Sequence, residues 1–245
     1  RRGKFLWLTL SGADEVAAAL VIHLGMSGQL RLGSPPSSHS RIRFDLSFPD
    51  GRTEVLDFVD QRTFGYVAVR DLVPTADGLP GGLGSDRPQV PDLAAHIARD
   101  LLDPHLDRTD LVHRIRARQT GIKRALLDQE LVSGIGNIYA SEILHRARVH
   151  PEIPCSRITP RSWQRVQAET VAVLEEAIRA KGSTLRDGNY RTAADEPGGF
   201  QDRHRVYGRE DLKCLQCGRG TVRRIVQAQR STYFCPVCQR KARGK

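Results

Sequence analysis

Four cysteines near the C-terminus have the residue type and spacing of a metal site. Cys214 and Cys217 form one Cys-x2-Cys pair, Cys235 and Cys238 form a second, and seventeen residues separate the pairs. Each pair places two thiolates on one side of a tight turn, and the segment between the pairs is long enough for a β-hairpin. No histidine lies in that segment. The pattern therefore predicts a closed, structural Zn2+ site; the alternative is two disulfides, which would leave Cys155 unpaired.

Basic side chains concentrate around these cysteines. The 245-residue chain has a formal net charge of +10, yet residues 1–200 hold 26 basic and 25 acidic side chains. Residues 201–245 hold 12 basic side chains and three acidic ones. A concentrated basic block favours a polyanionic partner, most often nucleic acid. For the last basic residues, from Arg240 onward, a solvated tail is the alternative.

A glycine-containing loop joins two predicted helices between Leu131 and Ala140. Gly134 and Gly136 allow the backbone to approach a partner closely, and Asn137 can cap the helix that follows. The N-terminus of a helix attracts anions, so a DNA phosphate is the expected ligand, and Lys123 could reach the same anion. A plain connection between two helices is the alternative. The loop has neither the Gly-Lys-Ser/Thr of a Walker motif nor a preceding strand.

The elements that position these residues divide the chain into two halves. Short apolar or alternating runs predict strands at residues 4–10, 19–24, 42–48 and 55–59, and strands without long helices between them pair antiparallel. Residues 74–91 are rich in glycine and proline and read as a linker.

The second half has helical periodicity. Helices are expected at residues 92–118, with a break near Pro104, and at 120–131 and 140–147. A long helix follows, with Thr159 as its N-cap and Gly182 just past its end. Residues 183–202 look like an exposed loop. The fold class is therefore α+β, with a zinc module at its end.

Composition excludes one broad class of protein. The length allows one or two domains with a sizeable core. No apolar run approaches the roughly 18 residues that a spanning helix needs, so a membrane protein is not expected.

Seven separated motifs occur in the order found in one known protein family. They are Ile22 to Gly28, Asp60 to Gly65, Leu126 to Gln129, Gly134 to Ala140, His150-Pro151, Val206 to Arg209, and the four-cysteine segment with Gln229-Arg230. Together they resemble the bacterial formamidopyrimidine-DNA glycosylases, relatives of endonuclease VIII. The resemblance covers essentially the whole chain.

The resemblance implies an architecture with DNA bound between two lobes. Its parts are an N-terminally incomplete antiparallel β-sandwich of catalytic type (1–73), a linker (74–91), a helix-two-turns-helix DNA-binding domain (92–182), an exposed lesion-side loop (183–204), a zinc ribbon (205–240) and a basic tail (241–245). One structural Zn2+ is expected in the ribbon. We expect a monomer that binds duplex DNA with an oxidised base and acts in the bacterial cytoplasm, associated with the nucleoid through DNA.

The family excises oxidised purines such as 8-oxoguanine and formamidopyrimidines, then cleaves the strand by β,δ-elimination. This chemistry needs the damaged nucleotide outside the base stack. By resemblance, Met26 fills the void, Arg62 faces the orphaned cytosine and Phe64 wedges the neighbouring step. The residue types suit these roles, since they supply a flexible apolar plug, a fork of donors and a flat ring. If the resemblance were not considered, Met26 and Phe64 would be interpreted as residues of the hydrophobic core.

The remaining site residues also come from the resemblance. Lys4 corresponds to a lysine near the lesion phosphate that donates a proton in β-elimination. Arg230 corresponds to an arginine at the phosphates flanking the lesion; because it stays protonated, we expect it to stabilise the leaving phosphate electrostatically. The expected contacts to the DNA backbone come from His39, Arg118, Lys123 and Asn137.

The sequence departs from the family at its start. The family's nucleophile is an N-terminal proline followed by a glutamate, whereas this sequence begins at Arg1. Lys4 is a poor substitute, because a lysine with a pKa near ~10.4 is almost wholly protonated at neutral pH. We therefore expect the catalytic segment to precede Arg1 in the complete enzyme, and the 245 residues alone to bind DNA without cleaving it.

Three other functions fit parts of the sequence. An endonuclease VIII-like enzyme would act on oxidised pyrimidines, but that branch fills the void with other residues than Met26, Arg62 and Phe64. A damage-binding protein without catalysis would naturally lack the N-terminal residues. A generic zinc-ribbon protein would leave the two upstream motifs unexplained.

Overall fold

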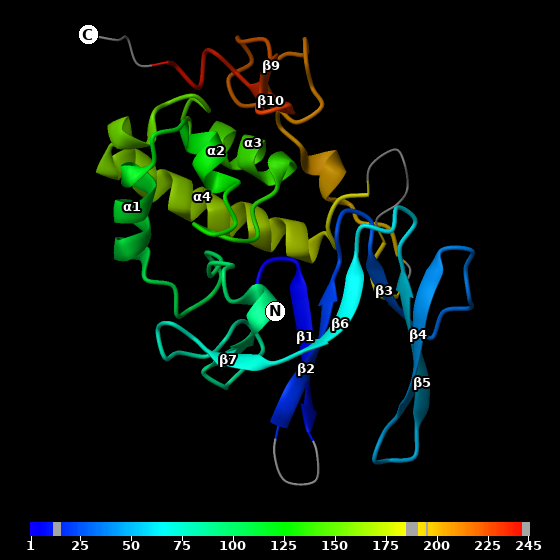
Figure 1. Cartoon of the computed structure of the whole chain (residues 1–245). Coiled ribbons are helices and arrows are strands. Elements are labelled where there is room, and N and C mark those ends of the chain that lie inside the picture. Colours follow the sequence, from blue (N-terminus) through cyan, green and yellow to red (C-terminus); the bar gives the residue numbers. More distant parts are fainter. Residues whose placement is uncertain (12–15, 185–190, 195, 242–245) are drawn as a thin grey trace.

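The computed structural model describes residues 1–11, 16–184, 191–194 and 196–241. Strands make up one lobe, helices the other, and a small hairpin lies over the helices at the C-terminal end (Figure 1). Part of the predicted loop at 183–204 and most of the tail at 241–245 lie outside the described residues. None of the helices among these residues combines the length and the apolar character that a membrane-spanning helix requires.

The strand lobe contains two three-stranded antiparallel sheets. One has the order β1-β2-β6, with β1 at Phe5–Ser11, β2 at Val16–His23 and β6 at Tyr66–Arg70. The other has the order β3-β5-β4, with β3 at Gln29–Leu32, β5 at Thr53–Val59 and β4 at Ser40–Ser47. The sheets form the predicted β-sandwich. Strands β3 and β6 are not among the predicted strands.

One face of the first sheet forms a small core. Phe5, Ala19 and Val21 are buried, as expected for side chains that alternate between the two faces of a strand. They pack against Val90 and Ala94 from the segment that leads to the helical lobe.

The predicted linker at 74–91 is folded. Its two ends pair as an antiparallel hairpin of β7 (Leu72–Pro74) and β8 (Gln89–Pro91). Arg99 clamps the hairpin, because its guanidinium contacts the Asp77 carboxylate at 2.7 and 2.9 Å and the Asp103 carboxylate at 2.8 Å. The glycine and proline content therefore marks tight turns in an ordered connection.

The helical lobe differs from prediction at its beginning. Its helices are α1 (Arg108–Ala117), α2 (Ile122–Leu126), α3 (Asn137–Arg146) and α4 (Pro160–Arg179), with 3-10 turns at Asp92–Ala94, Cys155–Arg157 and Phe200–Arg203. The helix expected from residue 92 starts only at Arg108. Asp100 and Asp103 accept hydrogen bonds from the backbone two residues further on, at 2.9 Å each, and such local turns compete with a helix.

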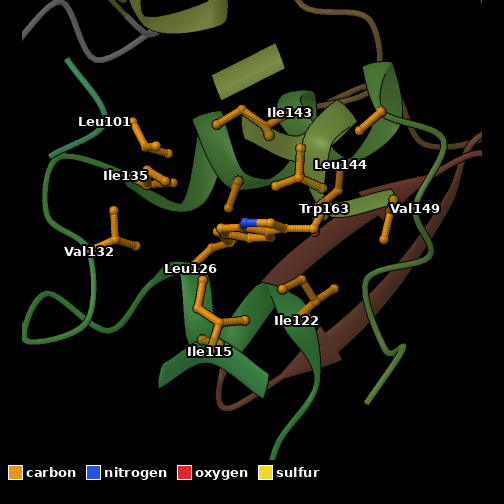
Figure 2. Packing of buried hydrophobic residues seen from close by; sticks show 14 of the residues in the cluster. Leu101, Ile115, Ile122, Leu126, Val132, Ile135, Ile143, Leu144, Val149 and Trp163 are labelled. Atoms are coloured by element: carbon orange, nitrogen blue, oxygen red, sulfur yellow. The ribbon is translucent and has the colours of Figure 1, made fainter. Parts of the chain in front are cut away.

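The long helix α4 begins and ends as predicted. The Thr159 hydroxyl accepts from the backbone N–H of Ser162 at 3.2 Å, and Gly182 has a φ of +81° just beyond the last turn. One face of α4 packs on α3, and Trp163 lies flat in the centre of the core between Leu126 and Leu144 (Figure 2). Phe200 is fully buried in the same core, so the expectation of an exposed loop is wrong at that end.

The C-terminal module is a two-stranded ribbon of β9 (Arg223–Gln227) and β10 (Arg230–Phe234). It docks on α3 and on the segment after it (Figure 1). The Gln239 amide donates to the Val149 carbonyl at 2.8 Å, and both residues of this contact are buried. The ribbon is therefore packed against the helical lobe.

Candidate active site and nucleic-acid interface

A cavity of about 1040 Å³ lies where the strand lobe, the helical lobe and the ribbon meet. Four of the predicted site residues line it: Lys4, Met26, Phe64 and Arg230. The backbone from Gly134 to Gly136 lines the same cavity, as do residues of α4 and Thr192 and Ala193. The fold thus gathers, at one place, side chains separated by more than two hundred positions in the sequence.

Lys4 lies just before β1 and points toward the Met26 loop. Its Nζ donates to the Gly25 carbonyl at 2.7 Å. Burial lowers the pKa of Lys4, and the positive charge of Arg230 lowers it further. A lysine with a lowered pKa gives up its proton more readily, which suits the predicted role of proton donor.

Met26 and Phe64 are exposed, at 67% and 54% of their surface. The Arg62 guanidinium stacks 5.2 Å from the centre of the Phe64 ring. Gly25 has a φ of +55°, and a Cβ added there would lie 2.6 Å from the Phe64 carbonyl carbon. The loops that carry these side chains therefore touch backbone to backbone, and they present apolar groups where a partner could cover them.

Lys123 and Asn137 meet, but not as exposed anion ligands. Lys123 is 1% exposed, and its Nζ donates to Asn137 Oδ1 at 2.6 Å, to Thr232 Oγ1 at 2.7 Å and to the Ser231 carbonyl at 3.2 Å. Burial and the charge of Arg230 lower the pKa of Lys123 to about 8. All three ammonium hydrogens have protein acceptors, so in this structure Lys123 joins α2 and α3 to β10.

The predicted capping role of Asn137 is wrong. Gly136 is the N-cap of α3, with no side-chain hydrogen bond, and Asn137 is the first helical residue. The Asn137 amide donates instead to the Ser231 carbonyl at 3.0 Å. The ribbon competes successfully for this side chain because its backbone lies directly against the start of α3.

Arg230 begins β10 at the tip of the ribbon. The turn before it holds Ala228 and Gln229 at φ values of 46° and 60°, which tightens the hairpin. Among the ion pairs of the described residues, none involves Arg230. A fixed positive charge thus lines the cavity from the ribbon, close enough to Lys4 to lower its pKa.

His39 and Arg118 do not line the cavity. Arg118 lies at the end of α1, with Nη2 3.0 Å from Asp128 Oδ2. The His39 carbonyl accepts from the Asp60 backbone N–H at 3.0 Å. The structure therefore does not bring these two residues together with the others, and their predicted roles as DNA-backbone contacts stay predictions.

The four cysteines fit one structural zinc ion. All four Sγ atoms lie within 4.8 Å of one another. The distance between Sγ atoms is 3.8 Å for Cys214 and Cys238, and 3.8 Å also for Cys217 and Cys235. A tetrahedral ion with Zn–S bonds of about 2.3 Å has S–S edges of about 3.8 Å. The ion would join the two knuckles of the ribbon.

Sequence reasoning missed two polar side chains that hold the site, the half-buried Gln129 and the buried Glu142. Gln129 receives the backbone N–H of Gly134 at 3.1 Å and donates to the Ile135 carbonyl at 3.2 Å, so it fixes the glycine loop. Glu142 is fully buried and accepts three backbone N–H groups, those of residues 205–207, at 2.8–2.9 Å. Gln129 ends one of the seven motifs, yet nothing in its residue type distinguishes it from an exposed amide.

Comparison with known proteins assigns the family. Family models match in three places: the formamidopyrimidine-DNA glycosylase N-terminal domain at residues 1–67, the H2TH domain of the same enzymes at 97–189, and a zinc finger found in FPG and IleRS at 211–240. The chain is 43% identical over 243 residues to the formamidopyrimidine-DNA glycosylase of Leifsonia xyli subsp. xyli, covering 98% of this chain and 80% of the relative. The chain belongs to the formamidopyrimidine-DNA glycosylase family.

Other members of the formamidopyrimidine-DNA glycosylase family agree in sequence and structure. The Kineococcus radiotolerans relative is 46% identical over 248 residues, covering 98% of this chain and 79% of its own. The crystal structure of the MutM (Fpg) protein from Thermus thermophilus superposes with a TM-score of 0.76 at 37% identity, covering 98% of this chain and 80% of that one. The Lactococcus lactis Fpg in complex with DNA containing an abasic site superposes with a TM-score of 0.73 at 28% identity, with the same coverage.

Proposed function

We propose that this protein is a DNA repair glycosylase and abasic-site lyase that removes oxidised purines, such as 8-oxoguanine and formamidopyrimidines, from duplex DNA. The observation that carries this proposal is the single cavity that gathers Lys4, Met26, Phe64 and Arg230 in a member of the formamidopyrimidine-DNA glycosylase family. The Lactococcus lactis Fpg structures include complexes with abasic-site and Fapy-dG DNA. We also propose that the protein acts as a monomer on DNA in the bacterial cytoplasm.

The first step is removal of the damaged nucleotide from the stack. Unstacking a base costs a few kcal/mol, and side chains that fill the hole offset this cost. Met26 supplies an apolar plug, Phe64 a ring for the neighbouring base step, and Arg62 a fork of donors for the base left without its partner. The exposure of Met26 and Phe64 supports these roles.

The second step is strand cleavage around the flipped sugar. Elimination leaves negative charge on the departing phosphate oxygens, and fixed positive groups stabilise it. Arg230 faces the cavity from the ribbon as a permanent charge. Lys4 lines the same cavity from just before β1, and its lowered pKa makes it the better proton donor of the two.

Binding and chemistry should be tested separately. We expect the chain to bind a duplex with a tetrahydrofuran abasic analogue opposite cytosine at least about tenfold more tightly than the intact duplex, measured by fluorescence anisotropy. The Arg62→Ala variant should lose its preference for cytosine over adenine opposite the analogue. Arg161 is an exposed arginine at the start of α4. The Arg161→Ala variant loses the same charge and should keep the preference for cytosine.

Lesion choice distinguishes the two branches of the family. We expect a duplex with 8-oxoguanine opposite cytosine to bind more tightly than one with thymine glycol. A preference for thymine glycol would favour the oxidised-pyrimidine branch. Borohydride trapping on the 8-oxoguanine duplex then shows whether an amine of this chain attacks the sugar. Because Lys4 is the proposed proton donor, an adduct that persists in Lys4→Ala would show that another amine is the nucleophile.

A further inference from the structure

The two loops that carry the exposed wedge residues share one buried carboxylate. Asp60 follows the last residue of β5 and is fully buried. Its Oδ1 accepts from the Ser27 hydroxyl at 2.6 Å and from the Arg62 backbone N–H at 3.2 Å. Its Oδ2 accepts from the Gly65 backbone N–H at 2.7 Å. Because Ser27 directly follows Met26, one side chain is bonded to the loop at 24–28 and to the loop at 61–65.

The second loop needs this support. Thr63 has a φ of 53°, in the left-handed region that a β-branched residue rarely adopts. Such a conformation persists only where the surroundings impose it. The Asp60 carboxylate binds the backbone on both sides of Thr63, at Arg62 and at Gly65. It therefore holds the turn that presents Arg62 and Phe64.

The contacts also require a carboxylate rather than an amide. Each Asp60 oxygen accepts from a backbone N–H, that of Arg62 at Oδ1 and that of Gly65 at Oδ2, and an amide would place its NH2 group against one of these two donors. Burial alone would raise the pKa of Asp60, but the hydrogen bonds from the Ser27 hydroxyl and the loop backbone outweigh it and hold the pKa below its usual value. The group is thus an anion at neutral pH.

We propose that Asp60 is a positioning residue that locks the Met26 loop and the Arg62–Phe64 loop into one rigid unit, so that all three side chains enter the base stack together. The inference rests on the proposed function and adds a residue that contacts neither the DNA nor the reacting atoms. A preformed unit loses little conformational entropy on binding. Two independent loops would each lose conformational entropy when they become ordered on the DNA, and this loss would weaken binding. Rigidity of the two loops should therefore increase the affinity for abasic duplex DNA, into which the three side chains insert, more than the affinity for intact duplex.

The test is Asp60→Asn with 2-aminopurine placed next to the abasic analogue. Insertion of the wedge unstacks this base, so its fluorescence rises on binding. In Asp60→Asn we expect a smaller rise, and a preference for the abasic duplex over the intact duplex that falls about tenfold. Affinity for the intact duplex and bound zinc should stay within about twofold of the wild type, since the ribbon and the backbone contacts are untouched.

The chain offers a matched control three residues earlier, within β5. Asp57 is also fully buried and accepts from a serine hydroxyl, that of Ser40, at 2.5 Å. It faces β4 rather than the two loops. Asp57→Asn should therefore lower the melting temperature without changing the fluorescence rise or the preference. Ser27→Ala removes the hydrogen bond from the Met26 loop to Asp60 and also the bond that the Ser27 hydroxyl accepts from the Arg62 backbone N–H at 3.2 Å. It leaves the Asp60 bonds to Arg62 and Gly65, and should give an intermediate effect even if Asp60→Asn does not fold.

Two results would overturn the proposal: wild-type fluorescence and preference in both Asp60→Asn and Ser27→Ala, or equal losses in Asp57→Asn. Failure of the proposed function gives a different result. In that case the wild-type chain itself would not prefer the abasic duplex.

Discussion

At the scale of single residues, three cationic side chains at the same junction differ in their surroundings. Lys123 is buried with three protein acceptors, and Lys4 donates to one carbonyl at the wall of the cavity. Arg230 lies at the tip of the ribbon and faces the open cavity. A cation already satisfied by protein acceptors gains little from a phosphate, so Arg230 is the strongest candidate for a phosphate contact.

We predict that Arg230→Ala weakens DNA binding and makes the dependence of log Kd on log salt shallower by about 1, because one phosphate contact is lost. The measurement is a titration of abasic duplex at several salt concentrations. Arg161→Ala serves as the control and should keep the wild-type slope. An unchanged slope in Arg230→Ala would remove this residue from the phosphate contacts.

At the scale of elements, the ribbon depends on its metal and on the helix beneath it. Its two strands have five residues each, too few to fold around a core of their own. The His145 ring nitrogen Nε2 lies 3.3 Å from Cys214 Sγ, so α3 contacts a zinc ligand directly. The metal site and the helical lobe thus hold the strand that presents Arg230.

Removal of zinc should unfold the ribbon and abolish tight DNA binding, while the helical lobe stays folded. Zinc supplies roughly 10–16 kcal/mol to small cysteine-rich modules, which the ribbon cannot replace by packing. Zinc release by a chelator, DNA affinity and the fluorescence of buried Trp163 would be followed together. Addition of Zn2+ should restore binding; full affinity after stoichiometric zinc loss would contradict the prediction.

At the scale of the whole molecule, the position of one lobe against the other sets the cavity. Contacts near the junction hold the lobes together: Arg1 reaches Asp100 at 2.8 Å, Arg2 donates to the Ile97 carbonyl at 3.2 Å, and Arg99 binds Asp77 of the hairpin at 2.7 Å. The hairpin also packs on the strand lobe, where a Cβ added at Gly82 would lie 2.9 Å from the Trp7 ring. The hairpin is thus a rigid connection between the lobes.

The ion pair of Asp77 should make the hairpin sensitive to acid. The hydrogen bond from Arg99 is the main cause that lowers the pKa of Asp77 from 3.8 to about 2. A lowered carboxyl pKa stabilises the fold above the unfolded pKa, and this stabilisation is lost as the pH falls toward the folded pKa. Asp77→Asn should therefore lower the melting temperature at pH 6, with a difference from wild type that narrows between about pH 4 and pH 2.

Unfolding near the hairpin can be followed by tryptophan fluorescence, because the chain has only two tryptophans, Trp7 and Trp163. In a Trp163→Phe background only Trp7, beside the hairpin, reports unfolding. A difference between Asp77→Asn and its parent that stays constant down to pH 2 would show that the ion pair does not stabilise the hairpin.

The sequence by itself determined the features that depend on short spacing. The zinc ligands follow from two Cys-x2-Cys pairs, and the limits of α4 follow from Thr159 and Gly182, because turns and caps involve residues a few positions apart. The seven motifs together indicated the family and its α+β fold, which the comparisons confirmed.

Only the tertiary structure decided which polar groups hold the site. Lys123 binds Thr232, 109 positions away, and Asp60 binds Ser27, 33 positions away. Contacts of this range leave no periodic pattern, and a buried lysine or aspartate has the same residue type as an exposed one. Burial and the direction of each side chain are set by the packing of separate elements, so the partners of these groups are fixed only when the lobes and the ribbon come together.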